Sequence, residues 1–88
     1  MIEEALTHDP QIERNALGAC MLDGDAVIDA ITLEEEEFGD LRNRKVWLAI
    51  RALDERRAPI NLVTVEAEMA SQGTLAGVGG AVYLVDVL

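Results

Sequence analysis

The stretch from Gly39 to Arg57, GDLRNRKVWLAIRALDERR, contains the only tryptophan of the chain and its longest helical period. Its apolar residues recur at spacings of three and four, which places them on one side of a helix. They are Val46, Trp47, Ile50 and Leu53. Asp40 is a suitable N-cap, because its carboxylate can accept from the first free backbone N–H groups, and Pro59 stops the helix. The sequence therefore predicts a central helix with one buried side.

The other side of this helix is basic. It carries Arg42, Arg44, Lys45 and Arg51. The simpler interpretation of these residues is a solvated helix face, and the alternative is a surface that binds another protein. Trp47 shares the apolar stripe, so we expect it in the core.

Upstream of the central helix, Asp9 and Pro10 form a helix start, with aspartate as N-cap and proline at the first helical position. The predicted helix runs from Pro10 to about Leu22. Its apolar stripe is Ile12, Ala16, Leu17, Cys20 and Met21. Gly18 and Ala19 are small enough to let another helix approach closely. Residues 1–9 are expected to form a flexible arm, and residues 25–31 a second helix.

The segment from Leu33 to Gly39 contains four consecutive glutamates, so we expect a loop or a single turn that aims Phe38 at the core. Downstream, Asn61 or Thr64 is expected to cap a fourth helix that ends at Gly73. Residues 74–80 are expected to form a loop that places Leu75 and Val78 on the bundle. Residues 81–88 have strand-like content, but no partner strand is visible elsewhere, so a helix is favoured.

These elements predict an all-α fold, a compact bundle of about five short helices in one domain spanning residues 10–88. We expect its core to contain Leu17, Phe38, Val46, Trp47, Ile50, Leu53, Val65 and Met69.

Charge and composition exclude several classes of protein. The 88 residues include 17 acidic and 7 basic side chains, a formal charge of −10, which repels a phosphate backbone. No apolar run approaches the roughly 20 residues that span a bilayer. The single cysteine cannot form an internal disulfide, and the acidic N-terminus does not resemble a secretory signal. We expect a cytoplasmic domain that binds neither nucleic acid nor membrane directly.

The sequence does not contain a recognisable catalytic arrangement. His8 lies in the predicted arm and Cys20 on an apolar stripe, whereas a nucleophile needs an adjacent, oriented base. Residues 34–37 are all glutamate and could bind calcium or magnesium, but adjacent side chains point in different directions and do not form a calcium loop. Gly77, Gly79 and Gly80 lack the Gly-Lys-Ser/Thr ending of a phosphate-binding loop. We predict no catalytic, cofactor or metal site.

The order of several short motifs is more informative. Pro10, Glu13 and Leu17-Gly18 are followed by Met21-Leu22-Asp23, then by Phe38, Asn43, Arg44 and Trp47. Pro59-Ile60-Asn61 with Val63-Thr64 comes next, and Gly73, Leu75, Gly79-Gly80 and Tyr83-Leu84 complete the series. In this order and spacing, the chain resembles the N-terminal domain of DnaB-type replicative DNA helicases of bacteria and phages. Asn43 stands where that family usually has histidine, and Asn61 where it usually has aspartate.

The resemblance implies a part of a ring-shaped hexameric motor that unwinds DNA with ATP hydrolysis. The motor domain, with its ATP and magnesium, would follow a linker and is not in this sequence. This module would form a collar, self-associate, and help to recruit primase and a helicase loader. Its predicted partner-binding residues are Arg42, Arg44, Lys45, Arg51, Tyr83 and Val87.

Tyr83 is expected to pack its ring and keep its hydroxyl at a wet edge. Residues 81–88, apolar on nearly every side, are expected to leave an edge that self-associates. One alternative is a free-standing adaptor or inhibitor that binds a helicase or primase. Another is a metal protein or acid-dependent hydrolase built on residues 34–37.

Overall fold

The computed structural model describes residues 9–23 and 33–88. Its elements in chain order are helix α2 (Pro10–Leu22), the 3₁₀ turn η1 (Glu35–Glu37), and helices α4 (Leu41–Glu55), α5 (Leu62–Gln72), α6 (Leu75–Val78) and α7 (Ala81–Val87). The described residues contain these five α-helices and no strand, so the all-α prediction is confirmed. Most of the predicted arm and the predicted helix at 25–31 lie outside the described residues.

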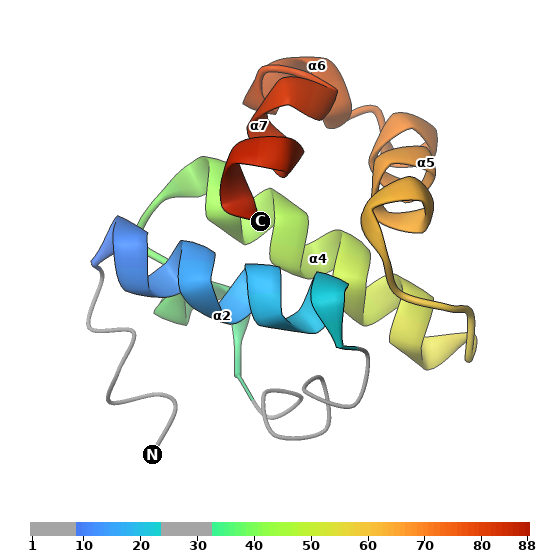
Figure 1. The fold of residues 1–88 in the computed structure, drawn as a ribbon, viewed down its shortest axis with the longest axis horizontal. Coiled ribbons are helices and arrows are strands. Elements are labelled where there is room, and N and C mark those ends of the chain that lie inside the picture. Colours follow the sequence, from blue (N-terminus) through green and yellow to red (C-terminus); the bar gives the residue numbers. More distant parts are fainter. Residues whose placement is uncertain (1–8, 24–32) are drawn as a thin grey trace.

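Helices α2 and α4 form the base of the bundle and run along its long axis (Figure 1). Each begins at the predicted aspartate cap. The Asp9 carboxylate accepts from the backbone N–H of Gln11 (2.9 Å), and the Asp40 carboxylate accepts from that of Arg42 (2.8 Å). Both caps satisfy N–H groups that the first turn of a helix leaves without a carbonyl.

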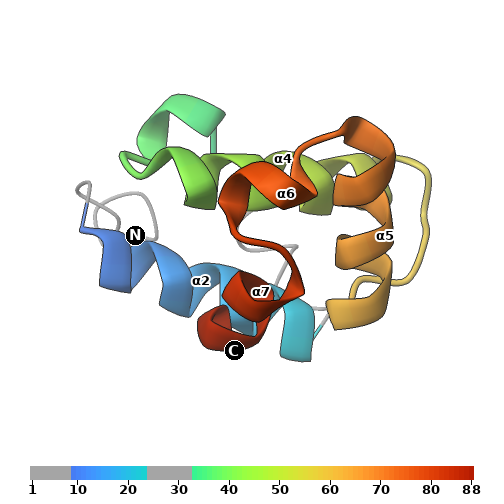
Figure 2. The same cartoon turned by 90° about the horizontal axis from the view of Figure 1, so that it is seen from above.

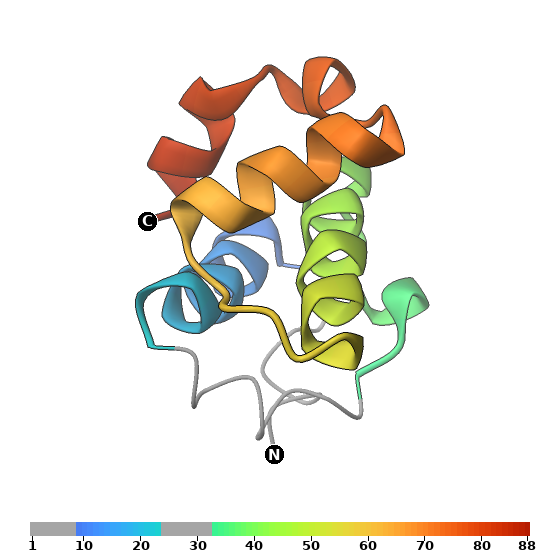
Figure 3. The same cartoon turned by 90° about the vertical axis from the view of Figure 1, so that its right-hand side faces the viewer.

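Helix α5 crosses one end of α4 (Figure 3). It begins at a reciprocal cap, in which the Asn61 side chain accepts from the Thr64 N–H (3.0 Å) and the Thr64 hydroxyl accepts from the Asn61 N–H (2.9 Å). It ends at Gly73, whose φ of 77° lies in the left-handed region. The predicted start and stop of this helix are confirmed.

The predicted loop at residues 74–80 is partly wrong, because Leu75–Val78 form the short helix α6. Leu75 and Val78 are three residues apart and both contact the core, which a single helical turn achieves. Gly79 ends this turn with a φ of 104°. Helix α7 follows and lies over α2 when the molecule is seen from above (Figure 2).

All eight residues predicted for the core are buried. The Trp47 ring stacks on Phe38 with centroids 5.6 Å apart, and its indole N–H donates to the Leu33 carbonyl at 3.2 Å. The single turn η1 carries Phe38 into this position, as the sequence predicts. The tryptophan therefore joins the central helix to the segment that precedes it.

Helices α2 and α7 approach each other at Gly18. A Cβ atom at this position would lie 2.6 Å from the Val87 carbonyl oxygen, closer than Cβ atoms approach other heavy atoms in proteins. The prediction of a close helix approach is confirmed for Gly18. Ala19 does not take part in it, because its side chain points to solvent.

Candidate functional site

Three polar side chains from three helices meet in the interior. Glu13 comes from α2, Asn43 from α4 and Tyr83 from α7, and all three are buried. We call them the buried polar network. Glu13 lies four residues before Leu17 and thus on the inner side of α2. This spacing is the feature of the sequence from which its burial could have been predicted.

Glu13 holds the start of the central helix. Its carboxylate accepts from the backbone N–H groups of Gly39 (2.7 Å) and Asp40 (3.2 Å) and from the Asn43 side-chain amide (3.0 Å). Hydrogen bonds to a charged acceptor are stronger than those between neutral groups. The contact therefore fixes α4 against α2 across an interval of some thirty residues.

Asn43 joins Glu13 to Tyr83. Its amide nitrogen donates to Glu13 and to the Pro10 carbonyl (3.3 Å), and its side-chain oxygen accepts from the Tyr83 hydroxyl. The expectation that the Tyr83 hydroxyl lies at a solvent-exposed edge was wrong. The ring points inward from α7, which begins after Gly80, and Asn43 supplies a buried acceptor for the hydroxyl. Burial raises the pKa of this hydroxyl above its ordinary value. It is therefore a neutral hydrogen-bond donor at neutral pH.

The side chains of the buried polar network bond to groups of the chain itself. Within the described residues, no buried side-chain nitrogen or oxygen lacks a hydrogen-bond partner. A satisfied network specifies one packing arrangement of its helices. We interpret these three residues as a structural clamp.

The four predicted basic residues of α4 have different environments. Arg42 pairs with Asp40 (3.2 Å) and covers the Tyr83 ring, with 4.6 Å between guanidinium carbon and ring centroid. Arg44 donates to the Phe38 carbonyl (3.0 and 3.2 Å), and Arg51 lies 3.6 Å from a Glu34 oxygen. Lys45 is exposed. Arg42 and Arg44 therefore also stabilise the fold, and Lys45 and Arg51 are the freer charges.

The two partner-binding candidates in α7 lie inside the chain. Tyr83 is 8% exposed and Val87 is 5% exposed, and both belong to the core cluster. Their neighbours point outward instead: Val82 is 71% exposed and Val85 is 55% exposed. The apolar edge of α7 that the sequence predicts therefore consists of Val82, Val85 and Leu88, which we call the α7 edge.

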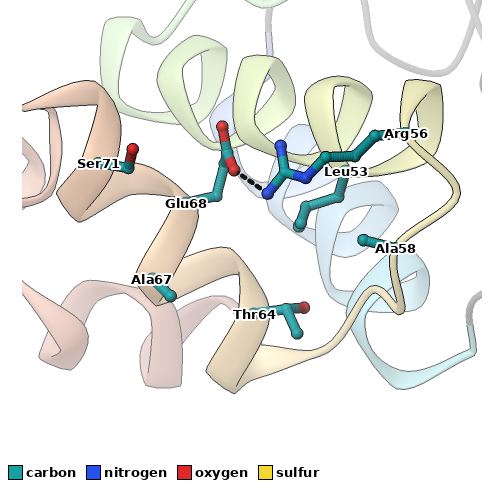
Figure 4. Close-up of a pocket in the computed structure, with 7 residues that line it drawn as sticks. All are labelled: Leu53, Arg56, Ala58, Thr64, Ala67, Glu68 and Ser71. Carbon is teal, nitrogen blue, oxygen red and sulfur yellow. Dashed lines mark hydrogen bonds and ion pairs between the residues drawn. The ribbon is translucent and has the colours of Figure 1, made fainter.

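A pocket of about 250 Å³ opens between the end of α4 and α5 (Figure 4). Its lining residues are Leu53, Arg56, Ala58, Thr64, Ala67, Glu68 and Ser71. The Arg56 guanidinium donates to the Glu68 carboxylate across it and lowers the pKa of that carboxyl. This ion pair neutralises the two charged groups of the pocket and links α4 to α5.

The remaining candidates for chemistry have structural surroundings. Cys20 is buried, and burial raises its thiol pKa to about 11, so the nucleophilic thiolate is scarce at neutral pH. Glu34 and Glu37 cap η1, where the Glu37 carboxylate accepts from the Glu34 N–H at 2.7 Å. Within residues 9–23 and 33–88, no group of three or more histidine, cysteine or acidic residues is arranged to hold a metal. The helices of the described segments are all too short or too polar to cross a bilayer.

Comparison with known proteins identifies the family. The model of the DnaB-like helicase N terminal domain matches residues 5–88.

The chain belongs to the DnaB-like helicase N-terminal domain family.

Curated relatives and a solved structure agree with this assignment. The chain is 33% identical over 78 residues to the replicative DNA helicase DnaC of Bacillus subtilis and 36% identical over 75 residues to the replicative DNA helicase DnaB of Geobacillus stearothermophilus. These matches cover 88% and 84% of this chain, but only 17% and 16% of the relatives. The crystal structure of the N-terminal domain of DnaB helicase from Mycobacterium tuberculosis superposes with a TM-score of 0.87 at 34% identity, over 92% of this chain and 59% of that one.

Membership in the DnaB N-terminal domain family gives the motif positions a physical meaning. Glu13, Asn43 and Tyr83 come from three separate motifs, and the fold joins them into one network. Asn43, at the position where the resemblance implies histidine, both donates and accepts here. These three motif residues thus mark a packing contact between helices.

Proposed function

We propose that this chain is an assembly and docking module of a hexameric replicative DNA helicase and has no catalytic activity of its own. The observation that supports the proposal most directly is the family match across residues 5–88. The chain spans between 13% and 18% of four curated replicative helicases that it matches. Unwinding of DNA, with ATP and magnesium, would therefore be the task of a motor domain that these 88 residues do not include.

The surface of the domain agrees with a role in assembly. Val82 and Val85 on α7 are more than half exposed, and Leu88 is 45% exposed, whereas Tyr83, Leu84 and Val87 are buried. An exposed apolar group of this kind at the end of a small domain favours association with another protein surface. We propose that the α7 edge contributes to self-association into the helicase collar.

The negative charge of the domain agrees with a position in a collar through which DNA moves. A net charge of −10 repels phosphate groups, so a collar of such domains would let a strand pass without retaining it. Primase and a helicase loader are the proposed protein partners. This chain would not itself bind nucleic acid.

The proposal is tested by recovery of partners from the native cell extract. The tagged chain is incubated with extract, washed, and its bound proteins are identified by mass spectrometry, with an unrelated acidic helical domain of similar size as the control. Recovery of helicase subunits together with primase or a loader is the expected result. Recovery of proteins unrelated to replication would contradict it, and recovery of primase without helicase subunits would favour a free-standing adaptor.

Self-association is tested separately by sedimentation equilibrium. The double variant Val82→Ser/Val85→Ser is compared with Val63→Ser, which changes a valine on α5 that is 72% exposed. The α7 variant should dissociate at concentrations where the α5 variant stays associated. Equal behaviour of the two variants would show that the α7 edge is not the contact.

A further inference from the structure

The outer face of α4 combines apolar and basic side chains. Leu41 and Leu48 are seven residues apart, and they are 63% and 37% exposed. Lys45 lies between them, four residues after the first leucine and three before the second, so the three side chains share one face of the helix. Arg44 and Arg51 flank this stripe at the same spacing of seven. We call these five residues the outer α4 face.

This face retains positive charge on an acidic domain. Six of the seven basic residues lie between positions 42 and 57. Arg42 and Arg56, which lie outside this face, are neutralised by Asp40 and Glu68. On the face itself, Arg44 contacts a neutral carbonyl, and Lys45 has no ion-pair partner among the described residues.

Arg51 has the only acidic partner on this face within the described segments. Its guanidinium lies 3.6 Å from Glu34, whose side chain is 69% exposed. An exposed ion pair of this length contributes little and is readily exchanged for another carboxylate. The outer α4 face therefore presents two leucines and three cations, and each cation can accept an acidic neighbour.

We propose that the outer α4 face docks an acidic amphipathic helix of a partner protein. The seven-residue repeat of the leucines matches the contact that one helix makes along another, and the cations select a partner with carboxylates beside its apolar stripe. Nucleic acid is disfavoured as the occupant, because the domain as a whole carries a charge of −10 and repels a phosphate backbone. The inference rests on the proposed function, since it locates a site at which a replication partner binds.

The test uses two designed helical peptides of about three heptads, with leucine at the a and d positions. One peptide carries glutamate on both sides of the leucine stripe and the other carries lysine. Each is titrated into the isotopically labelled 88-residue chain, and backbone amide shifts are followed by NMR. The glutamate peptide is expected to shift the amides of residues 41–51, to bind more tightly than the lysine peptide, and to weaken as salt is added.

Matched variants locate the contact. Leu48→Ser is compared with Val63→Ser, because both remove an exposed apolar side chain from a helix. Lys45→Gln is compared with Arg57→Asn, because both remove one exposed positive charge. The α4 variant of each pair should raise the dissociation constant at least about threefold relative to its control, since the contact combines apolar and charged terms. Melting temperatures of all four proteins verify that they are folded.

Three results would overturn the proposal: shifts confined to α7, equal binding of the two peptides, and equal weakening by both members of each pair. An absence of peptide binding at millimolar concentration would do the same. The proposed function is tested by different readouts, because recovery of replication proteins from extract does not depend on this peptide. Recovery of those proteins without peptide binding at α4 would reject the docking site alone, and peptide binding without their recovery would reject the function.

Discussion

Tyr83 donates its hydroxyl hydrogen to the side-chain oxygen of Asn43, forty residues earlier in the chain. This contact connects the last helix to the central helix, and Asn43 passes the connection on to Glu13 in the first described helix. Three helices that touch different parts of the core are thus held in one relative arrangement. The relationship has consequences that measurements of stability can check.

Replacing Tyr83 by Phe removes only the hydroxyl and leaves the Asn43 oxygen buried without its donor. We expect the free energy of unfolding to fall by about 1–3 kcal/mol, the cost of an unsatisfied buried polar group. Urea unfolding followed by tryptophan fluorescence measures it. The network also predicts coupling: the double variant Asn43→Leu/Tyr83→Phe should lose less than the sum of the two single losses. Strict additivity would show that the contact contributes nothing.

Position 43 offers a second comparison. Histidine can also donate to Glu13 through one ring nitrogen and accept from Tyr83 through the other. Asn43→His should therefore retain most of the stability, whereas Asn43→Leu should lose it. Thermal unfolding of the two variants decides this, and equal losses would mean that the larger ring does not fit between the three helices.

Gly18 should tolerate no larger side chain. The added methyl group of Gly18→Ala would meet the Val87 carbonyl oxygen at 2.6 Å, so α7 must move away from α2. We expect a loss of about 1–3 kcal/mol, typical of overpacking. Gly77→Ala is the matched control, because its Cβ would meet nothing within 4 Å and it lies in helix α6. A melting temperature unchanged in both variants would mean that the two helices separate without cost.

Arg57 is the only residue other than glycine with a positive φ in the described segments, at 57°. It ends the central helix, where the Ala58 N–H donates to the Leu53 carbonyl at 2.9 Å. A side chain in this left-handed geometry costs about 1–2 kcal/mol. Arg57→Gly should therefore raise the free energy of unfolding by about 0.5–1 kcal/mol, after allowance for the greater freedom of glycine in the unfolded chain.

Arg57→Ala separates strain from charge in this prediction. Alanine removes the same positive charge but keeps a Cβ atom in the strained geometry. Chemical denaturation of the three proteins should rank glycine above arginine, with alanine at or below arginine. If Arg57→Ala raised the free energy of unfolding as much as Arg57→Gly does, the effect would come from charge, because alanine relieves no backbone strain.

The Arg56–Glu68 pair predicts how stability depends on pH. The hydrogen bond from Arg56 holds the pKa of Glu68 below its ordinary value of 4.5. A lowered folded pKa gives stability that is present above the ordinary value and lost as the pH falls through the lowered one. Glu68→Gln should therefore be less stable than the parent chain at neutral pH, and this difference should shrink as the pH falls below 4.5 and through the lowered pKa.

Denaturant titrations at several pH values measure the difference. Glu66→Gln serves as the control, because it removes the same charge from α5 outside the ion pair. The Glu66→Gln difference therefore measures the loss of one negative charge from α5 without the loss of the ion pair. A Glu68→Gln difference that stays constant over the whole acid range in which the parent chain remains folded would mean that the carboxylate charge does not contribute.

Local sequence determined helices α2, α4 and α5 and most of their ends. Aspartate before proline, asparagine three residues before threonine, and glycine after an apolar period each act within one or two helical turns, so they can be identified without knowing the fold. The apolar period of the central helix likewise placed Trp47, Ile50 and Leu53 in the core. Order and spacing of the motifs also indicated the family, which the comparisons confirm.

Other features depended on distances between residues far apart in sequence. Glu13, Asn43 and Tyr83 are separated by thirty and forty residues, and no periodicity indicates that a carboxylate, an amide and a phenol will meet. The inward direction of Tyr83, the approach of α7 to Gly18 and the extra turn of α6 have the same origin. Helical periodicity specifies which side of a helix is buried, whereas the partners of a buried side chain are set only when the helices pack.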